Sequence, residues 1–278
     1  MKRKLLILLI MTFIILIFKN YVIVLESATY AAKVWFYNVF PYLFIMIIIE
    51  DLLINLNFAS FFKNNALYIF VMSILSGSPT GAYIIAKLYK QKIISMKYAN
   101  ICLIFTFFVN PLFLYSMLNT LFLNKYITIK LMLIIYITNF FMYIIYKKDL
   151  PIESKSLNYK EINISSSIKT SINTTITVLG VITFYLILSN TLIKEFNLLY
   201  PFNIFFKGFL EMTQGLISLA NANIIHKELL AMAFISFGGF SIHTQVASIL
   251  NDVGLSYKYF LKGRFIQTIL VVFLTIVT

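Results

Sequence analysis

The chain has 278 residues, of which 60% are hydrophobic and only 12% are charged, and its mean hydropathy is +0.89. A soluble domain carries about 25% charged residues, so this composition excludes a soluble globular protein and predicts several membrane crossings. The net charge of +13 comes largely from lysines at the ends of apolar segments, so it indicates membrane topology and does not support nucleic-acid binding.

The first segment begins with Lys2-Arg3-Lys4 and continues as an apolar run. This pattern favours an uncleaved N-terminal membrane anchor over residues 1–30, with a cleaved signal peptide as the alternative. A second span is expected from Val34 to Phe58, with Pro41 near its start and Glu50 in its second half.

The third apolar stretch, residues 66–89, is interrupted by Ser76-Gly-Ser-Pro-Thr-Gly81. Gly and Pro stop a helix and leave backbone groups unpaired, which is tolerated at membrane depth only beside protein or a water-filled cavity. We expect a re-entrant hairpin or a broken helix here. A fourth span, residues 98–122, is interrupted by Asn110-Pro111, and a fifth covers residues 127–146.

A basic polar segment then divides the chain into two halves. We assign residues 31–146 to a first repeat, residues 147–171 to a cytoplasmic linker and residues 172–278 to a second repeat. In the second repeat we expect spans at 172–192, 202–220, 229–250 and 260–278, the third of them broken by Phe237-Gly-Gly-Phe-Ser241.

Two glutamates lie inside spans, and a shift of 161 residues superimposes Glu50 on Glu211 and Gly77 on Gly238. The sequence therefore predicts an all-α polytopic membrane protein with duplicated halves and two broken or re-entrant helical hairpins. Lysine-rich loops after both Gly-containing breaks favour two hairpins entered from the cytoplasm, in parallel repeats. Inverted repeats are the alternative, and they are the commoner build of secondary transporters.

An ionisable group inside a span is costly and suggests a functional site. A buried carboxylate can bind and release a proton near neutral pH, as a proton-coupled carrier requires. The alternative for Glu211 is an ion pair with Lys207, one helical turn earlier. The neighbouring Asp51 suggests that Glu50 lies near the membrane surface.

The breaks supply the other candidate binding residues. Helix ends that face a cavity present unpaired N–H groups, which suit an anion, although small residues also serve close helix packing. The predicted substrate-binding or pathway residues are Glu50, Ser76, Gly77, Ser78, Pro79, Thr80, Gly81, Asn110, Pro111, Glu211, Thr213, Gln214, Gly238, Gly239, Ser241, His243, Thr244 and Gln245.

Other chemistry is not indicated. The single cysteine, Cys102, excludes an intramolecular disulfide, and His243 has no neighbouring ligands for a metal. We expect His243 to line a cavity, and Arg264 to reach the membrane surface or to help hold an anion. No nucleophile–base pattern, P-loop or dinucleotide motif occurs, so we predict no enzyme activity, no cofactor and no metal.

Several motifs together resemble the sporulation integral membrane protein YlbJ family, within the group that has nucleoside-recognition "gate" domains. They are Phe40-Pro41-Tyr-Leu-Phe, Ser76-Gly-Ser-Pro-Thr-Gly-Ala82, Asn110-Pro-Leu-Phe113, Gly208-Phe-Leu-Glu-Met-Thr-Gln-Gly215 and Phe237-Gly-Gly-Phe-Ser-Ile-His-Thr-Gln-Val-Ala-Ser-Ile-Leu250. Ser78 stands where the family commonly has Tyr, and family members are usually longer.

The resemblance implies gate-like repeats in a multi-pass protein of the bacterial cell membrane, in the outer forespore membrane of a spore former. It implies transport of dipicolinic acid, a small aromatic dianion, toward the forespore. The gate-domain relatives suggest a nucleoside or nucleobase carrier as an alternative, and a membrane assembly factor that transports nothing is a third. The expected partners are the lipid bilayer and the substrate, with a homo-oligomer left open.

Overall fold

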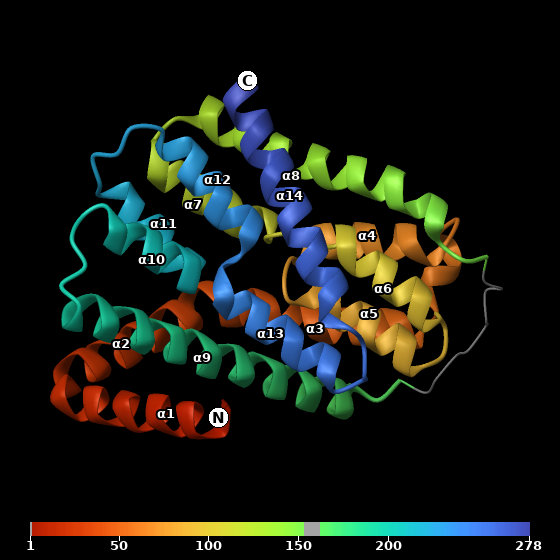
Figure 1. The fold of residues 1–278 in the computed structure, drawn as a ribbon. Helices are drawn as coiled ribbons and strands as arrows, with labels where there is room; N and C mark the ends of the chain where they lie inside the picture. The colour runs from red at the N-terminus through yellow and green to blue at the C-terminus, as the bar shows by residue number, and fades with distance from the viewer. Residues whose placement is uncertain (1, 153–161) are drawn as a thin grey trace.

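The computed structural model describes residues 2–152 and 162–278, and its fold is shown in Figure 1. Every regular element in these residues is helical, and no strand occurs among them. Five of the described helical segments are long and apolar enough to cross a membrane. The chain is therefore an all-α multi-pass membrane protein, as predicted. Part of the expected linker, residues 153–161, lies outside the described residues.

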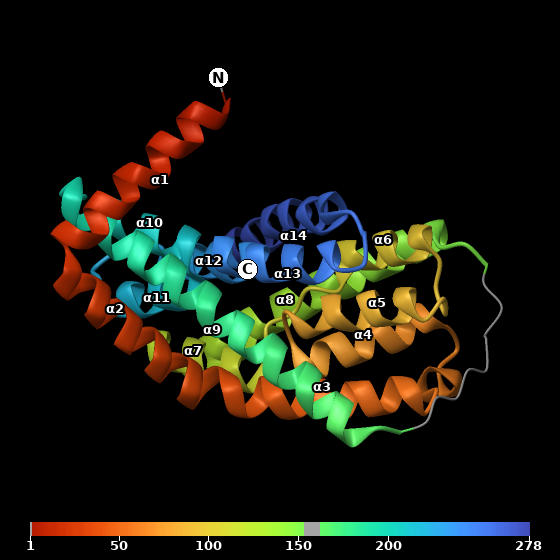
Figure 2. The same ribbon diagram turned by 90° about the horizontal axis from the view of Figure 1, so that it is seen from below.

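The first crossing is longer than expected. The chain begins with α1 (Lys2–Lys19). The crossing comes next and consists of α2 (Tyr21–Val34), the π-helical turn η1 (Trp35–Val39) and α3 (Phe40–Asn55). Together they form an apolar segment of 35 residues, and α1 diverges from the rest of the molecule (Figure 2). The expected anchor boundary near residue 30 falls inside α2. The helix breaks instead at buried Asn20, whose amide nitrogen donates to the Leu16 carbonyl at 3.1 Å.

The next pair of helices forms a re-entrant hairpin. After the 3-10 turn η2 (Phe58–Phe61), α4 (Asn65–Ser76) runs to the middle of the molecule and α5 (Thr80–Lys90) returns to the same end (Figure 1). A side chain on Gly81 would lie 2.7 Å from both the Ser73 hydroxyl and the Thr106 carbonyl, so only glycine allows this close packing. The first predicted break is thus a hairpin, as the charge pattern favoured.

A second hairpin lies in the segment that we expected to be one span. Here α10 (Phe202–Leu210) reaches the middle and α11 (Met212–Ala220) turns back, packed against it. The prediction of a continuous crossing over residues 202–220 is therefore wrong. A side chain on Gly215 would collide with the backbone of Gly208, so the two glycines let the helices pack at close range.

Two further helices cross the molecule with a break in the middle. They are α6 (Met96–Phe105) with α7 (Pro111–Phe122), and α12 (Lys227–Phe237) with α13 (Gly239–Asn251). The second predicted Gly-containing break, at Gly238, therefore interrupts a crossing helix and forms no hairpin. Gly238 and Gly239 have φ values of 90° and 66°, a conformation that redirects the chain and favours glycine.

The remaining elements are continuous. They are α8 (Lys125–Tyr146) with the 3-10 turn η3 (Lys147–Asp149), α9 (Ile164–Glu195) and α14 (Tyr257–Val277). We expected α9 to begin at residue 172, after the linker. It begins earlier because the Asn163 side chain caps it, accepting from the Ser166 N–H at 2.9 Å.

The two halves are arranged as inverted repeats. Each half contains a long helix, a hairpin, a broken crossing helix and a continuous helix, in that order. The α4–α5 hairpin enters from the end of the molecule where α8 ends and α9 begins, and the α10–α11 hairpin enters from the opposite end (Figure 1). Parallel repeats, which the sequence favoured, are therefore wrong for this structure.

The equivalent positions are also about 132 residues apart, rather than 161. Thr80 and Met212, the first residues of α5 and α11, differ by 132 in number, as do Lys125 and Tyr257, which begin α8 and α14. The shift of 161 pairs the α4–α5 hairpin with the broken helix α12–α13. Glu50 and Glu211 are consequently not equivalent residues.

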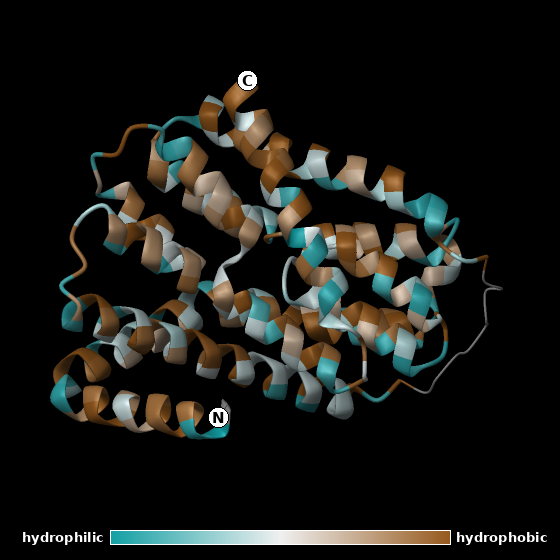
Figure 3. Ribbon diagram, in the orientation of Figure 1, coloured by the Kyte–Doolittle hydropathy of each residue, from teal (hydrophilic) through white to brown (hydrophobic). Residues whose placement is uncertain are grey.

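The inverted arrangement agrees with the distribution of charge. Basic residues follow α5, follow α8 and begin α14, at one end of the molecule, where Figure 3 also shows polar colouring. The positive-inside rule assigns this end to the cytoplasm. The sequence prediction placed the second hairpin at Gly238, and for that reason the charge pattern required both hairpins to enter from the same side.

Candidate functional site

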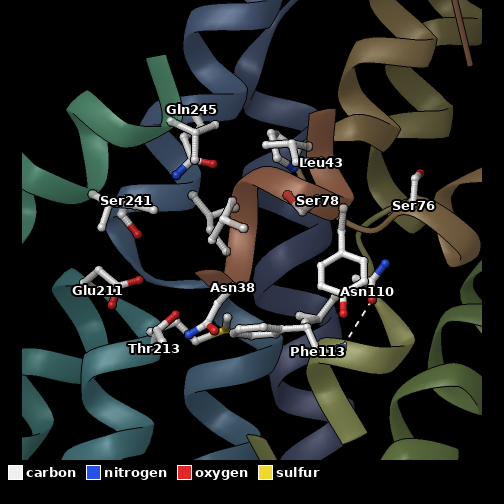
Figure 4. A pocket seen from close by; sticks show the side chains of 18 residues that line it. Asn38, Leu43, Ser76, Ser78, Asn110, Phe113, Glu211, Thr213, Ser241 and Gln245 are labelled. Atoms are coloured by element: carbon white, nitrogen blue, oxygen red, sulfur yellow. Dashed lines mark hydrogen bonds between the residues drawn. The ribbon is translucent and has the colours of Figure 1, made fainter. Parts of the chain in front are cut away.

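A cavity of about 100 Å³ lies at the centre of the molecule, where both hairpins and both broken helices meet (Figure 4). An engineered cavity of about 150 Å³ holds a benzene molecule, so this space is smaller than a ring-containing compound requires and would have to widen to admit one. Four helices begin beside it, namely α5, α7, α11 and α13. Asn110 and Glu211 cap α7 and α11, whereas α5 and α13 have no side-chain cap, so the N–H groups of these two helices make the surroundings of the cavity favourable to negative charge.

Eight of the predicted residues line this cavity: Ser76, Ser78, Pro79, Asn110, Glu211, Thr213, Ser241 and Gln245. The structure brings them together from four separate segments of the chain. The other ten do not line it: Glu50, Gly77, Thr80, Gly81, Pro111, Gln214, Gly238, Gly239, His243 and Thr244.

The first hairpin turn is held against the break between α6 and α7. Gly77 has a φ of 78°, and a side chain there would lie 2.9 Å from the Asn110 Cα. The Asn110 amide nitrogen donates to the Leu75 carbonyl at 3.3 Å, and its oxygen caps α7 at the N–H groups of Leu112 and Phe113. Gly77 and Asn110 therefore position the turn, and Pro111 occupies the first position of α7, where its missing N–H costs nothing.

Two serine hydroxyls at the cavity have no hydrogen-bond partner among the described residues. They belong to Ser78 in the first hairpin turn and to Ser241 in the first turn of α13. Buried polar groups are nearly always hydrogen-bonded. Both residues line the cavity, and since the hydroxyl oxygens themselves are buried, a rotation of each side chain would be needed to bring them to a ligand.

Glu211 occupies the turn of the second hairpin. Its backbone is extended, and its carboxylate caps α11 by accepting from the Gln214 N–H at 2.7 Å. The carboxylate also lines the cavity (Figure 4). Lys207 and Glu211 form no ion pair in the described part of the chain, since the helix that would have placed them one turn apart ends at Leu210.

Gln214 ties the second hairpin to the long helices. Its side-chain nitrogen donates to the Asn190 oxygen at 3.0 Å, and the Asn190 nitrogen donates to the Ser27 hydroxyl at 3.0 Å. This chain of hydrogen bonds joins α11, α9 and α2. Gln214 therefore holds the hairpin in place rather than lining the cavity.

His243 and Thr244 face away from the cavity. The His243 ring hydrogen-bonds to the Tyr257 hydroxyl and, at 2.9 Å, to the Phe237 carbonyl, so both of its nitrogens are occupied. Thr244 lies on the exposed side of α13, 2.7 Å from the Tyr185 hydroxyl. The expectation that His243 lines the cavity is thus not met, because its ring is held between α12 and α14.

The two acids of α3 have different surroundings. Asp51 forms an ion pair with Lys87 and accepts hydrogen bonds from Tyr83 and Ser167, both at 2.6 Å. Glu50 is fully buried, and neither of its carboxylate oxygens has a hydrogen-bond partner among residues 2–152 and 162–278. Ser76, which lines the cavity, and Lys87 are close enough to interact with it electrostatically. Glu50 therefore lies behind the cavity wall rather than near the surface.

Arg264 is fully buried, so the expectation that it reaches the membrane surface is wrong. It donates to Gln267 and, at 3.3 Å, to the Ser236 carbonyl, and its guanidinium lies 4.0 Å from the centre of the Phe107 ring. These contacts hold it beside the breaks of both crossing helices. It does not line the cavity.

Sequence reasoning missed three polar or aromatic residues of the lining: Asn38, Tyr42 and Phe113. Asn38 and Tyr42 are four residues apart on one helix face, and Phe113 follows Asn110 by three, so helical spacing from a break could have found them. The other missed residues are apolar: Val39, Leu43, Val109, Val178, Ile182, Met212 and Ile242.

The lining contains one carboxylate, from Glu211, and neither lysine nor arginine. The helix N-termini are therefore the positive groups nearest to the lining. The described residues contain no cluster of three or more side chains suited to holding a metal.

Comparisons of the chain with models of known protein families, with curated proteins and with solved structures gave no match. The resemblance to the YlbJ family therefore stays a prediction.

Proposed function

We propose that this protein is a membrane transporter that binds a small polar metabolite in the central cavity. The observation that carries the proposal is the meeting of two hairpins, entered from opposite ends, with two broken helices around one cavity. Inverted repeats with interrupted helices near the membrane midplane are the usual build of a secondary transporter. The unpaired hydroxyls of Ser78 and Ser241 provide binding groups on opposite repeats.

The first candidate substrate is dipicolinic acid, carried across the outer forespore membrane. The family resemblance suggests it, and the uncapped N-termini of α5 and α13 favour its carboxylates. The Glu211 carboxylate would repel a dianion, and no cation of the lining offsets it. Dipicolinate would therefore enter together with protons, either on its own carboxylates or on Glu211.

A nucleoside or nucleobase is the second candidate, and the uncharged part of the lining favours it. Asn38 and Gln245 offer amide donors and acceptors, and Phe113 offers a face for stacking. Such a neutral ligand needs no compensating proton.

Uptake of labelled dipicolinate and labelled uridine by the purified protein in liposomes separates these candidates. We expect saturable uptake of one compound, which is abolished when both cavity hydroxyls are removed in Ser78→Ala with Ser241→Ala. Thr120→Val is the matched control, since this exposed hydroxyl bonds only to its own helix. Absence of uptake for both compounds would reject both substrates and favour the assembly-factor alternative.

A further inference from the structure

A second cavity, of about 120 Å³, lies between α9 and α13. Its lining includes polar residues, among them Asn173 and Thr177 on α9, with Ser248 and Asp252 on or beside α13. These positions belong to the first half of α9 and the last half of α13. Since α9 begins and α13 ends on the linker side, the second cavity lies between the central cavity and that side (Figure 1).

Three residues line both cavities: Pro79, Val178 and Gln245. They come from the first hairpin, from α9 and from α13. Val178 and Gln245 are buried, with exposed fractions of 3% and 5%. These three residues therefore separate the two cavities. A movement of the first hairpin would displace Pro79 and open the separation on that side.

The opposite side of the central cavity is closed by hydrogen bonds. Gln214, Asn190 and Ser27 join the second hairpin to α9 and α2. One side-chain hydrogen bond joins α13 to α9, between Thr244 and Tyr185, and neither residue lines the second cavity. At the second cavity itself, Thr174 and Thr177 donate to carbonyls of their own helix.

We propose that the second cavity is a water-filled vestibule through which the substrate reaches or leaves the central cavity on the cytoplasmic side, with Pro79, Val178 and Gln245 as its gate. The hydroxyl and amide groups of the vestibule suit any small hydrophilic compound. The role of the vestibule as a substrate path rests on the proposed transport function. The existence of the water path is independent of the substrate.

The test is the reactivity of single cysteines toward a charged thiol reagent that does not cross membranes. In a Cys102→Ala background, Thr177→Cys and Ser248→Cys probe the vestibule. Ile176→Cys is the matched control, because Ile176 is an adjacent residue of α9 that is 55% exposed and does not line the cavity. Thiols react as thiolates, which require water, so a lipid-facing cysteine reacts slowly.

We expect both vestibule cysteines to react about tenfold faster than the control in inverted membrane vesicles, and not in intact cells. Equal rates for Thr177→Cys and Ile176→Cys would overturn the proposal, as would reaction in intact cells. Fast reaction in a protein that transports neither dipicolinate nor uridine would support the vestibule while counting against the proposed substrates. Gln245→Cys in the same background tests the gate. If dipicolinate or uridine slows its reaction with the thiol reagent, the result supports both the vestibule and the transport of that compound.

Discussion

Replacing Glu211 with glutamine isolates the charge of the carboxylate that lines the central cavity. In the wild-type protein the carboxylate accepts from the Gln214 N–H at 2.7 Å. Glutamine keeps an oxygen that can accept from the same N–H, so the cap of α11 is retained. A hydrogen bond to a charged group contributes about 1.5–3 kcal/mol and a neutral one about 1 kcal/mol. We therefore expect Glu211→Gln to lose about 1 kcal/mol of stability.

Alanine at the same position is the structural comparison. It removes the cap altogether, which costs about 1–2 kcal/mol and leaves a buried N–H unpaired. In a chain of this size, 1 kcal/mol corresponds to about 2–4 °C in the unfolding midpoint. Glu211→Gln should thus unfold a few degrees below wild type, and Glu211→Ala lower still.

The assays are the unfolding midpoint in detergent, the abundance in membranes and the uptake by liposomes. We expect Glu211→Gln to reach the membrane normally and to lose about tenfold in proton-driven dipicolinate uptake, a change of about 1.4 kcal/mol, because glutamine neither binds nor releases the proton that accompanies the substrate. Wild-type uptake by Glu211→Gln would refute a role for the charge. Because Lys207 and Glu211 form no ion pair in the described part of the chain, Lys207→Met should not raise the unfolding midpoint of Glu211→Ala, and a restored midpoint would contradict the structure.

Three further predictions follow from the geometry. Gly77→Ala should lower membrane abundance severely, because the φ of Gly77 is 78° and a side chain there would meet the Asn110 backbone. Gly180→Ala is the control, since Gly180 has open space around it, and equal abundance of the two variants would contradict the packing. Arg264→Met should leave abundance near wild type, because the Nε and Nη2 of Arg264 have no hydrogen-bond partner among the described residues and methionine keeps much of the side-chain volume. A large loss on immunoblots would show that the guanidinium stabilises the fold. Dipicolinate uptake should rise when the source side is acidified, because protons must offset the Glu211 charge, whereas uptake independent of pH would contradict proton entry with the substrate.

The membrane class and most breaks could be predicted from the sequence, because Gly and Pro mark them directly. The break at Glu211 could not, since Leu210-Glu211-Met212 contains no helix breaker. There the carboxylate caps its own helix, and the nearest signals, Gly208 and Gly215, are equally common in helix packing. Missing this break led to the repeat shift of 161 and to the parallel arrangement.

The candidate site was predicted only in part, for a related reason. Residues inside the breaks were found because polar groups are conspicuous in apolar segments. Asn38, Tyr42 and Phe113 lie in regular helix, and only the packing of η1, α3 and α7 brings them to the cavity. The direction of the His243 ring and the burial of Arg264 also depend on tertiary contacts with Tyr257 and Phe107.

The central claim is that two hairpins enter the membrane from opposite sides and meet at one cavity. In a Cys102→Ala background, single cysteines replace Lys92, just after the first hairpin, and Asn221, just after the second. A membrane-impermeant thiol reagent should label the cysteine at 92 only in inverted vesicles and the cysteine at 221 only in intact cells. Labelling of both from the same side would contradict the inverted arrangement and the cavity that depends on it.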